Sequence, residues 1–155
     1  MKFAVVQVRG VIGTSKKIKD SLKMLKLYRK NSCVILENNS VYIGMLNKLK
    51  DFITWGEVTE ETLFLLLKNR GRIVGNKLLT DDYLKGKLNT NIKDFASSLY
   101  SGKIKLKDIP GVKPYFRLCP PVMGYERAGV KKPYSMGGAL GYRKDNINEL
   151  VKRMI

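Results

Sequence analysis

Residues 2–8, which read KFAVVQV, constrain the fold most strongly, because both faces of the strand that they would form are apolar. Successive side chains of a strand point to opposite faces of a sheet. The alternation gives two sets of side chains, Phe3, Val5 and Gln7 on one face and Ala4, Val6 and Val8 on the other. Apolar side chains on both faces are typical of a strand in the middle of a sheet. The sequence therefore predicts that this segment is a central strand.

The rest of residues 1–58 continues with alternating helix and strand signals. The expected elements are a helix capped by Thr14 or Ser15, a strand over 31–37, a helix capped by Ser40 and a strand within 51–58 that ends at Gly56. This β-α-β-α-β order predicts a ferredoxin-like layer, with a right-handed crossover and helices packed on one face of the sheet.

Residues 59–155 predict a helical and loop-rich extension that packs on this layer. The expected helices span 60–70, 81–87, 92–101 and 146–154, and a short strand lies within 114–121. Residue types that favour helix ends mark their limits, with Thr59, Thr80 and Asp145 at the starts and Gly71 and Gly102 at the ends. We therefore expect an α+β protein in two parts, a ferredoxin-like core over 1–58 and an extension over 59–155.

A basic loop rich in glycine and proline interrupts the extension over residues 110–144. All five prolines fall in 110–133, and residues 111–144 hold seven Lys or Arg side chains against one Glu. The stretch 124–144 has five glycines, three tyrosines and little hydrophobic periodicity, so we expect no core within it. Such a segment is costly to order by itself, and we expect a polyanionic partner to hold it. The alternative is a solvated surface loop.

The formal net charge of +17 favours a polyanionic partner, because self-repulsion opposes compaction. RNA, DNA and an anionic membrane all satisfy this requirement. A membrane is disfavoured, since no apolar run approaches the ~18 residues of a span and the apolar stripe of the helix at 15–27 is narrow. Arg9 interrupts the apolar start of the chain, so no signal peptide is expected. The two cysteines are far apart, Cys33 within an apolar strand, and we expect a soluble protein in a reducing compartment.

An enzyme is disfavoured by the absence of histidine, the commonest general base and metal ligand. The carboxylate pairs at 60–61 and 81–82 fit first helical turns, where acidic side chains stabilise the helix start. Residues 9–17, RGVIGTSKK, do not match the spacing of a phosphate loop. This helix start is either a site for a backbone phosphate or an ordinary capped helix with a solvated face. No metal and no cofactor are expected.

Further cations and aromatic residues add to the basic loop. Arg70, Arg72 and Lys77 follow a helix end, where Arg70 complements the helix dipole and Arg72 lies beyond the helix. Tyrosines of the basic loop can stack on bases, and its Arg and Lys side chains can meet phosphates. Trp55 alternates with Ile53 in a strand, which favours packing on the sheet over base stacking.

The chain resembles the large-subunit ribosomal protein L30/L7e family in its long archaeal and eukaryotic form. The segments VRGVIG, SLKMLKLYRKNSCV, YIGMLNKLKDF and WGE look like the short bacterial form, and ETLFLLLKNRGR, LTDDYL, FRLCPP and GGALGYRKDNINELVKRM are similar to the additional part of the long form. The resemblance covers essentially the whole chain. It implies a cytoplasmic, non-catalytic component of the large subunit that binds rRNA, lies near 5S rRNA and contacts neighbouring ribosomal proteins. It implies no membrane, no small-molecule substrate and no second copy of the chain as a partner.

Two sets of residues are expected to contact RNA. The resemblance implies the first by position: Arg9, Lys16, Lys17, Arg29, Lys30, Gly44, Lys48 and Arg117, together with the 124–144 segment. The basic groups described above supply the second: Arg70, Arg72, Arg127, Lys131, Lys132, Tyr134, Arg143 and Lys144. Ile43 and Met123 stand where many relatives carry Arg, which removes a cation from each position. A non-ribosomal RNA-binding protein and an enzyme acting on RNA are the alternative functions.

Overall fold

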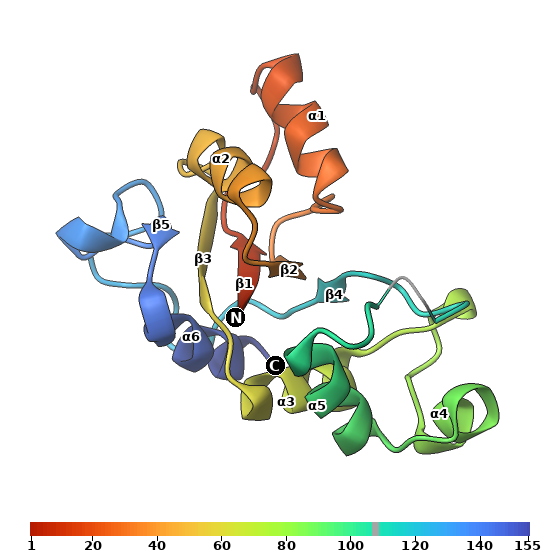
Figure 1. The fold of residues 1–155 in the computed structure, drawn as a ribbon. Coiled ribbons are helices and arrows are strands. Elements are labelled where there is room, and N and C mark those ends of the chain that lie inside the picture. Colours follow the sequence, from red (N-terminus) through yellow and green to blue (C-terminus); the bar gives the residue numbers. More distant parts are fainter. Residues whose placement is uncertain (107–108) are drawn as a thin grey trace.

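A computed structural model describes residues 1–106 and 109–155 of the chain (Figure 1). The first part contains β1 (Lys2–Gln7), α1 (Lys16–Met24), β2 (Ser32–Glu37), α2 (Ser40–Lys48) and β3 (Ile53–Glu57). The predicted β-α-β-α-β order is thus confirmed. Ser15 occupies the position before α1, but its side chain forms no capping hydrogen bond, and the residue before α2 is Asn39 rather than Ser40. Strand β3 ends at Glu57, one residue beyond the predicted Gly56.

The sheet has the order β4-β2-β1-β3-β5, so β1 is a central strand, as predicted. Strands β2 and β3 are both antiparallel to β1, and α2 therefore connects two strands that run in the same direction on either side of β1. The two outer strands come from the extension. They are β4 (Phe116–Arg117), antiparallel to β2, and β5 (Gly141–Tyr142), parallel to β3.

Each face of the sheet is covered by its own set of helices. Phe3 and Val5 pack with apolar side chains of α1 and α2, and the largely buried Trp55 joins this layer, so its predicted packing role is confirmed. Ala4 and Val6 pack instead against α3 (Glu60–Arg70), α5 (Ile92–Ser101) and α6 (Ile147–Met154), which Figure 1 shows on the side away from α1 and α2. The extension therefore supplies the second layer that the apolar faces of β1 require.

The helices of the extension lie close to their predicted positions. Helix α4 spans Asp81–Leu88, and short 3-10 turns occur at Val74–Asn76, Tyr134–Met136 and Lys144–Asn146. Thr59 caps α3 by accepting a hydrogen bond from the Thr62 amide at 3.4 Å, as predicted. Asp145 does not cap the last helix, because it lies inside the preceding 3-10 turn and Asn146 occupies the capping position. No helix among residues 1–106 and 109–155 is long and apolar enough to cross a membrane.

The burial of Cys33 agrees with its predicted place in an apolar strand. Its side chain has no exposed surface, and burial raises the pKa of its thiol to about 12. Cys119, by contrast, is exposed. The two thiols therefore differ strongly in their access to solvent.

At Gly56, strand β3 lies very close to the backbone of the turn before α6. A Cβ atom built there would lie 2.0 Å from the main-chain oxygen of Lys144 and 2.9 Å from Ile147. We expect Gly56→Ala to lower the free energy of unfolding by about 2–3 kcal/mol, because backbone cannot yield as a flexible side chain does. Thermal unfolding measures this.

Gly86 offers a matched control for that substitution. It lies within α4, and a Cβ built there meets no heavy atom within 4 Å. Gly86→Ala should therefore stabilise the protein by about 0.5–1 kcal/mol, through helix propensity alone. Equal melting temperatures for the two variants would contradict the close packing at Gly56.

Candidate nucleic-acid interface

Three loops meet at the end of the sheet where β1 stops and β2 and β3 begin. The Asn31 amide donates to the Gln7 carbonyl at 2.8 Å, and the Val8 amide donates to the Phe52 carbonyl at 2.9 Å. These bonds bring residues 8–15, 25–31 and 49–52 to the same end of the molecule. We call this end, together with α1, the basic end.

The basic end collects most cations of the first predicted set. Exposed side chains there belong to Lys16, Lys17, Arg29, Lys30 and Lys48. Lys48 donates a hydrogen bond to the Ser21 hydroxyl at 3.1 Å, which links α2 to α1. Arg9 is half-buried, with its guanidinium 5.2 Å from the centre of the Phe52 ring and hydrogen-bonded to the Asp51 carbonyl.

The basic loop reaches the same end from the opposite face of the sheet. Ala139 and Leu140 are buried against Val8, the residue that follows β1. The Tyr125 hydroxyl donates to the Asn31 side-chain oxygen at 2.9 Å, so the loop is also attached to the residue before β2. The exposed cations of this part of the loop are Arg127, Lys131 and Lys132, and the apolar side chains of Met123 and Met136 are exposed beside them.

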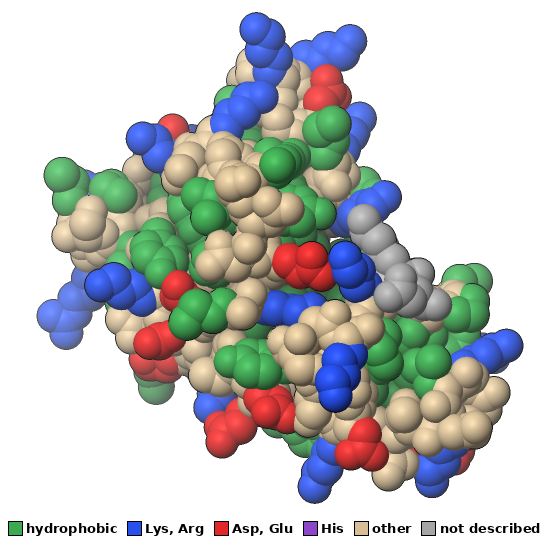
Figure 2. Space-filling model, in the orientation of Figure 1, with side chains coloured by type: hydrophobic (Ala, Val, Ile, Leu, Met, Phe, Trp, Pro, Cys, Tyr) green, Lys and Arg blue, Asp and Glu red, His purple; other side chains and the backbone are tan. Residues whose placement is uncertain are grey.

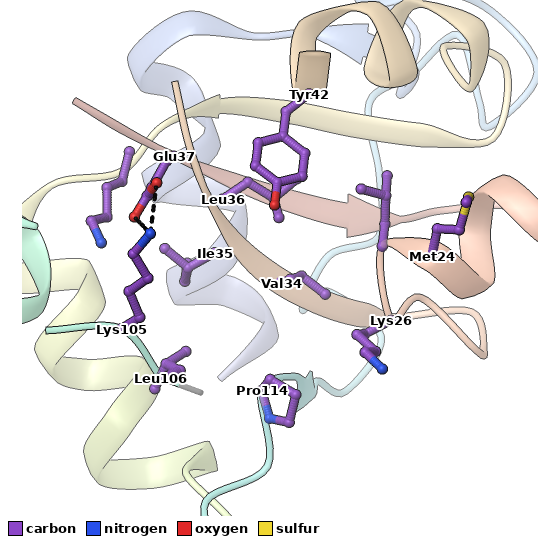
Figure 3. A pocket seen from close by; sticks show the side chains of 12 residues that line it. Met24, Lys26, Val34, Ile35, Leu36, Glu37, Tyr42, Lys105, Leu106 and Pro114 are labelled. Atoms are coloured by element: carbon purple, nitrogen blue, oxygen red, sulfur yellow. Dashed lines mark hydrogen bonds and ion pairs between the residues drawn. The ribbon is translucent and has the colours of Figure 1, made fainter. Parts of the chain in front are cut away.

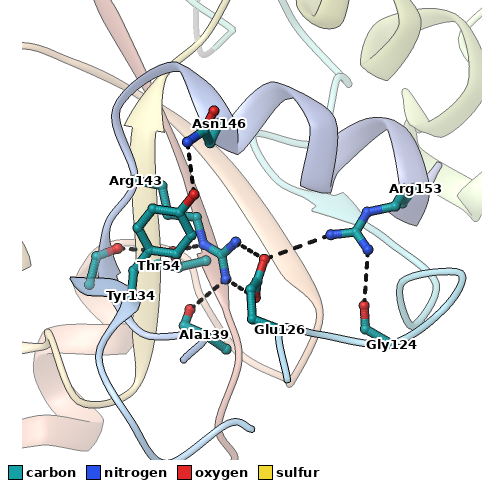
Figure 4. Close-up of polar contacts among 9 residues, drawn as sticks. Thr54, Gly124, Glu126, Tyr134, Ala139, Arg143, Asn146 and Arg153 are labelled. Carbon is teal, nitrogen blue, oxygen red and sulfur yellow. Dashed lines mark hydrogen bonds and ion pairs between the residues drawn. The ribbon is translucent and has the colours of Figure 1, made fainter. Parts of the chain in front are cut away.

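Arg143 attaches the basic loop to the sheet from within (Figure 4). Its side chain is only 1% exposed, and its guanidinium forms a bidentate ion pair with Glu126. The same guanidinium donates to the Thr54 hydroxyl at 2.8 Å and to the Ala139 carbonyl at 2.9 Å. It also lies 4.6 Å from the centre of the Tyr134 ring. We call this set of contacts the Arg143 clasp.

Two predictions about this segment are wrong. A buried guanidinium cannot reach RNA, so Arg143 does not belong to the contact set and instead fixes the loop that carries other cations. The stretch 124–144 also contributes Ala139 and Leu140 to a small buried cluster that it shares with Val8, and β5 joins it to the sheet. Contacts within the protein therefore hold this segment in a defined conformation.

Backbone hydrogen bonds hold the basic loop in a defined turn. The Tyr134 amide donates to the Leu140 carbonyl at 2.7 Å, and the Ala139 amide donates to the Gly129 carbonyl at 3.1 Å. Gly138 is required for this turn, since a Cβ there would lie 2.2 Å from the Lys132 carbonyl oxygen. The cations of the loop are thus presented on a rigid backbone, which reduces the entropy lost on binding.

The other predicted residues occupy several environments. Arg117, Gly44 and Lys144 are exposed on β4, on α2 and in the turn before α6. Arg70 is engaged within the protein, where it donates to the Ile155 carbonyl at 2.6 Å and contacts the Cys119 sulfur at 2.9 Å. Arg72 donates to the Asn76 carbonyl at 3.3 Å. These two arginines are half-buried, so their guanidinium groups already serve the fold.

Tyr134 and the residues around it line a surface hollow of about 310 Å³ beside β5. One face of its ring is covered by the Arg143 guanidinium, and its hydroxyl accepts a hydrogen bond from the Asn146 amide group at 2.7 Å. The ring is therefore held in place by two contacts and stays half-exposed.

Sequence reasoning missed some residues of this surface. Lys19 and Lys23 add cations to α1, and their spacing on the face opposite the apolar stripe was the available signal. Glu126 was also missed as an internal partner. It is the one acid among seven cations in residues 111–144, and such isolation can indicate a buried ion pair.

Acidic side chains are concentrated away from the basic end. Glu37 and Glu57 lie beside Lys2 and Phe3, at the start of β1 and thus at the opposite end of the sheet. Figure 2 shows Lys and Arg side chains projecting around α1, whereas most visible Asp and Glu side chains lie below, over α3 and α6. Lys and Arg side chains also occur over the lower part of the molecule in Figure 2, so the basic end differs from the rest mainly in its scarcity of acids.

The Arg143 clasp gives the protein a defined acid sensitivity. Burial is the largest single influence and raises the pKa of the Glu126 carboxyl, but the hydrogen bonds and the positive charges of Arg143 and Arg153 together outweigh it and hold the pKa below its ordinary value. A depressed folded-state pKa contributes stability above the unfolded value, about 4.3, and that contribution is lost as the pH falls through the folded pKa. Wild type should therefore exceed Glu126→Gln in stability at neutral pH, with a difference that shrinks below about pH 4. Urea unfolding at several pH values measures this, and a pH-independent difference would contradict the ion pair.

Comparisons with known proteins identify close relatives over the full length. The sequence pattern of the family "Ribosomal protein L30p/L7e" matches residues 3–53. The large ribosomal subunit protein uL30 of Methanococcus maripaludis is 48% identical over 155 residues, which cover 100% of both chains. Proteins of the same name from Methanopyrus kandleri and Nanoarchaeum equitans are 47% and 46% identical, over 96% and 99% of this chain and 100% and 98% of their own lengths.

Proposed function

Because this chain belongs to the ribosomal protein L30p/L7e family, we propose that it binds rRNA in the large ribosomal subunit through its basic end. The protein is a structural constituent of the ribosome and not an enzyme. Its place in the ribosome puts it in the cytoplasm. The proposal that the basic end binds RNA goes beyond family membership and is based on the geometry of that end.

The observation that carries the proposal is the convergence of cations from separate segments. Loops of the N-terminal part and the basic loop of the extension reach one end of the sheet from opposite faces. Phosphate oxygens accept hydrogen bonds from Arg, Lys and backbone N–H groups, and such contacts fix a protein on a folded RNA. A surface of this kind, with few carboxylates, suits the closely spaced phosphates of rRNA.

The proposed contact residues follow from their exposure, and most of them lie at or next to the basic end, whereas Lys144 lies beside Gly56, toward the other end of β3. The proposed residues are Arg9, Lys16, Lys17, Arg29, Lys30, Gly44, Lys48, Arg117, Arg127, Lys131, Lys132, Tyr134 and Lys144. Arg70 and Arg72 stay in the proposal as secondary contacts, because each is half-exposed and has N–H groups beyond the bonds described above.

Several finer features come from the family resemblance. We propose that the protein lies near 5S rRNA, contacts neighbouring ribosomal proteins and does not form a homo-oligomer. We also propose that residues 1–58 form a ferredoxin-like core domain and that residues 59–155 form a C-terminal extension packed on it. The extension covers the face of β1 that carries Ala4 and Val6, which supports this division.

A salt series tests the RNA-binding proposal. Contacts with even ~5 phosphates should give a log–log plot of affinity against salt concentration with a slope of about −4. The measurement is the affinity of the purified full chain for fragments of large-subunit rRNA between low and physiological salt. An affinity that does not change with salt would contradict binding through the basic end.

A further inference from the structure

The strand β2 is only partly covered on its outer side. Of its six residues, Ser32 and Cys33 pair with β4, which is two residues long. Within residues 1–106 and 109–155, no strand pairs with Val34–Glu37 on the side away from β1. An open strand edge presents backbone groups that can pair with another chain.

The ladder shows which backbone groups face outward. On β1, the Lys2 carbonyl and the Val8 amide bond toward the β3 side, so Phe3 and Val5 direct their backbone groups toward β2. Their partners are Leu36 and Val34, whose groups therefore point inward.

The backbone N–H and C=O groups of every second residue of β2 consequently point away from β1. These residues are Cys33, Ile35 and Glu37, and the preceding Asn31 carbonyl already accepts the Leu118 amide on this side. Beyond Cys33, the N–H and C=O groups of Ile35 and Glu37 are available to a strand of about four residues.

Pro114 explains why the protein does not close this edge itself. In the register of β4, where Phe116 lies opposite Cys33, the residue opposite Ile35 would be Pro114. Proline has no N–H to donate to the ladder. The chain turns away there, and the Lys113 amide bonds to the Arg72 carbonyl at 2.8 Å instead.

A groove lies along the open edge (Figure 3). Its volume is about 150 Å³, enough for one or two side chains of an incoming strand. Met24 and Tyr42 bound it on the α1 and α2 face, and Leu106 and Pro114 bound it on the other. Met24 is 74% exposed, so part of the apolar surface of the groove is accessible to solvent.

The charges around this groove select the kind of strand that fits. Lys2, Lys26 and Lys105 line it together with one acid, Glu37, which pairs with Lys105 at 3.3 Å. The cationic excess favours a carboxylate on the incoming chain. An RNA backbone cannot continue a β ladder, whereas an extended peptide satisfies both outward residues.

We infer that the outer edge of β2 from Val34 to Glu37 docks an extended segment of another protein, which adds a strand and places a carboxylate near Lys26. The inference rests on the proposed function, since a neighbouring protein in the large subunit is the partner that would supply the segment. It adds a protein-binding edge to a molecule whose basic end is proposed to bind RNA.

Site-specific crosslinking in the assembled subunit tests this inference. Benzoylphenylalanine in place of Met24, in the full chain incorporated into large subunits, should crosslink on irradiation to a protein segment that contains Asp or Glu. Subunits that contain the protein but yield a crosslink only to rRNA, or no crosslink, overturn the inference and leave the proposed function intact. Absence of the protein from large subunits overturns the proposed function itself.

A synthetic peptide of the crosslinked segment provides the second measurement. It should bind the free full-length protein and slow hydrogen exchange of the Ile35 and Glu37 amides. Glu37→Pro removes one outward N–H and should weaken binding roughly three- to tenfold relative to Glu37→Ala, which keeps the amide. Equal binding by the two variants, or unchanged exchange at Ile35 in wild type, overturns strand addition.

Discussion

Arg143→Ala is expected to lower the free energy of unfolding by about 3–5 kcal/mol, because it breaks an ion pair whose guanidinium is buried. The substitution leaves the Glu126 carboxylate without its main partner and removes donors from the Thr54 hydroxyl and the Ala139 carbonyl. For a chain of this size the melting temperature should fall by roughly 10 °C. Differential scanning calorimetry of the free protein measures the loss.

Two further substitutions distinguish the loss of the Arg143 contacts from the loss of a positive charge alone. Arg127→Ala removes a cation from the same loop, but the side chain is exposed, so the melting temperature should stay within about 1–2 °C of wild type. Arg143→Lys keeps the charge but not the bidentate geometry and should fall between wild type and Arg143→Ala. A melting temperature for Arg143→Ala that equals that of Arg127→Ala would show that the loop is not held from within.

Arg143→Ala should also weaken RNA binding indirectly. Loss of the Arg143 contacts frees the loop that presents Lys131 and Lys132, so limited proteolysis should cleave residues 124–144 faster in Arg143→Ala than in wild type. RNA affinity should fall with it, since the loop must then be ordered on binding. Protection of the loop by added rRNA would restore resistance to cleavage.

Lys131→Ala combined with Lys132→Ala should weaken rRNA binding by about tenfold or more and reduce the magnitude of the salt slope by about 2. Both side chains are exposed on a rigid turn. Alanine keeps the Cβ atom that packs near Gly138, so the melting temperature of the free protein should not change. Titration of labelled rRNA fragments across a salt series measures both quantities.

Lys85→Ala combined with Lys87→Ala is the matched control. It removes the same charge from exposed positions of α4, which lies far from α1 in the fold (Figure 1). The salt slope of this variant should stay close to that of wild type. If the two double variants lost affinity equally, net charge rather than the basic end would govern binding.

Local signals in the sequence predicted most of the regular structure. The two apolar faces of residues 2–8 identified the central strand, and each face has its own helical layer. Thr59, Gly71 and Gly102 mark helix ends where predicted, since capping depends on neighbouring residues alone. The errors at Asn39 and Asn146 shift helix starts by one residue, which is the usual uncertainty of an end.

The basic loop could not be predicted because its order depends on distant contacts. Strand β5 has two residues and no strand signal, and it pairs with Thr54 and Trp55 of β3. Thr54 and Arg143 are 89 residues apart in sequence and meet only when the sheet is complete. Composition gave the positive charge of this loop correctly but not which cation is buried.

The residues of the candidate RNA-binding surface could be predicted only in part. Charge and resemblance gave the identities of many exposed cations, whereas their convergence at one end follows from the strand order. Arg70 and Arg143 show the limit of this reasoning, since each guanidinium forms hydrogen bonds inside the protein. Exposure, which decides whether an arginine can meet a phosphate, is a property of the folded chain.

Crosslinking of purified large subunits tests the central claim most directly. Ultraviolet irradiation followed by mass spectrometry identifies the residues of this protein that are joined to rRNA. We expect the protein to be present in the subunits, with crosslinks concentrated at residues 9–17, 29–30 and 127–132 of the basic end. Absence of the protein from large subunits, or crosslinks confined to α3 and α4, would contradict the account.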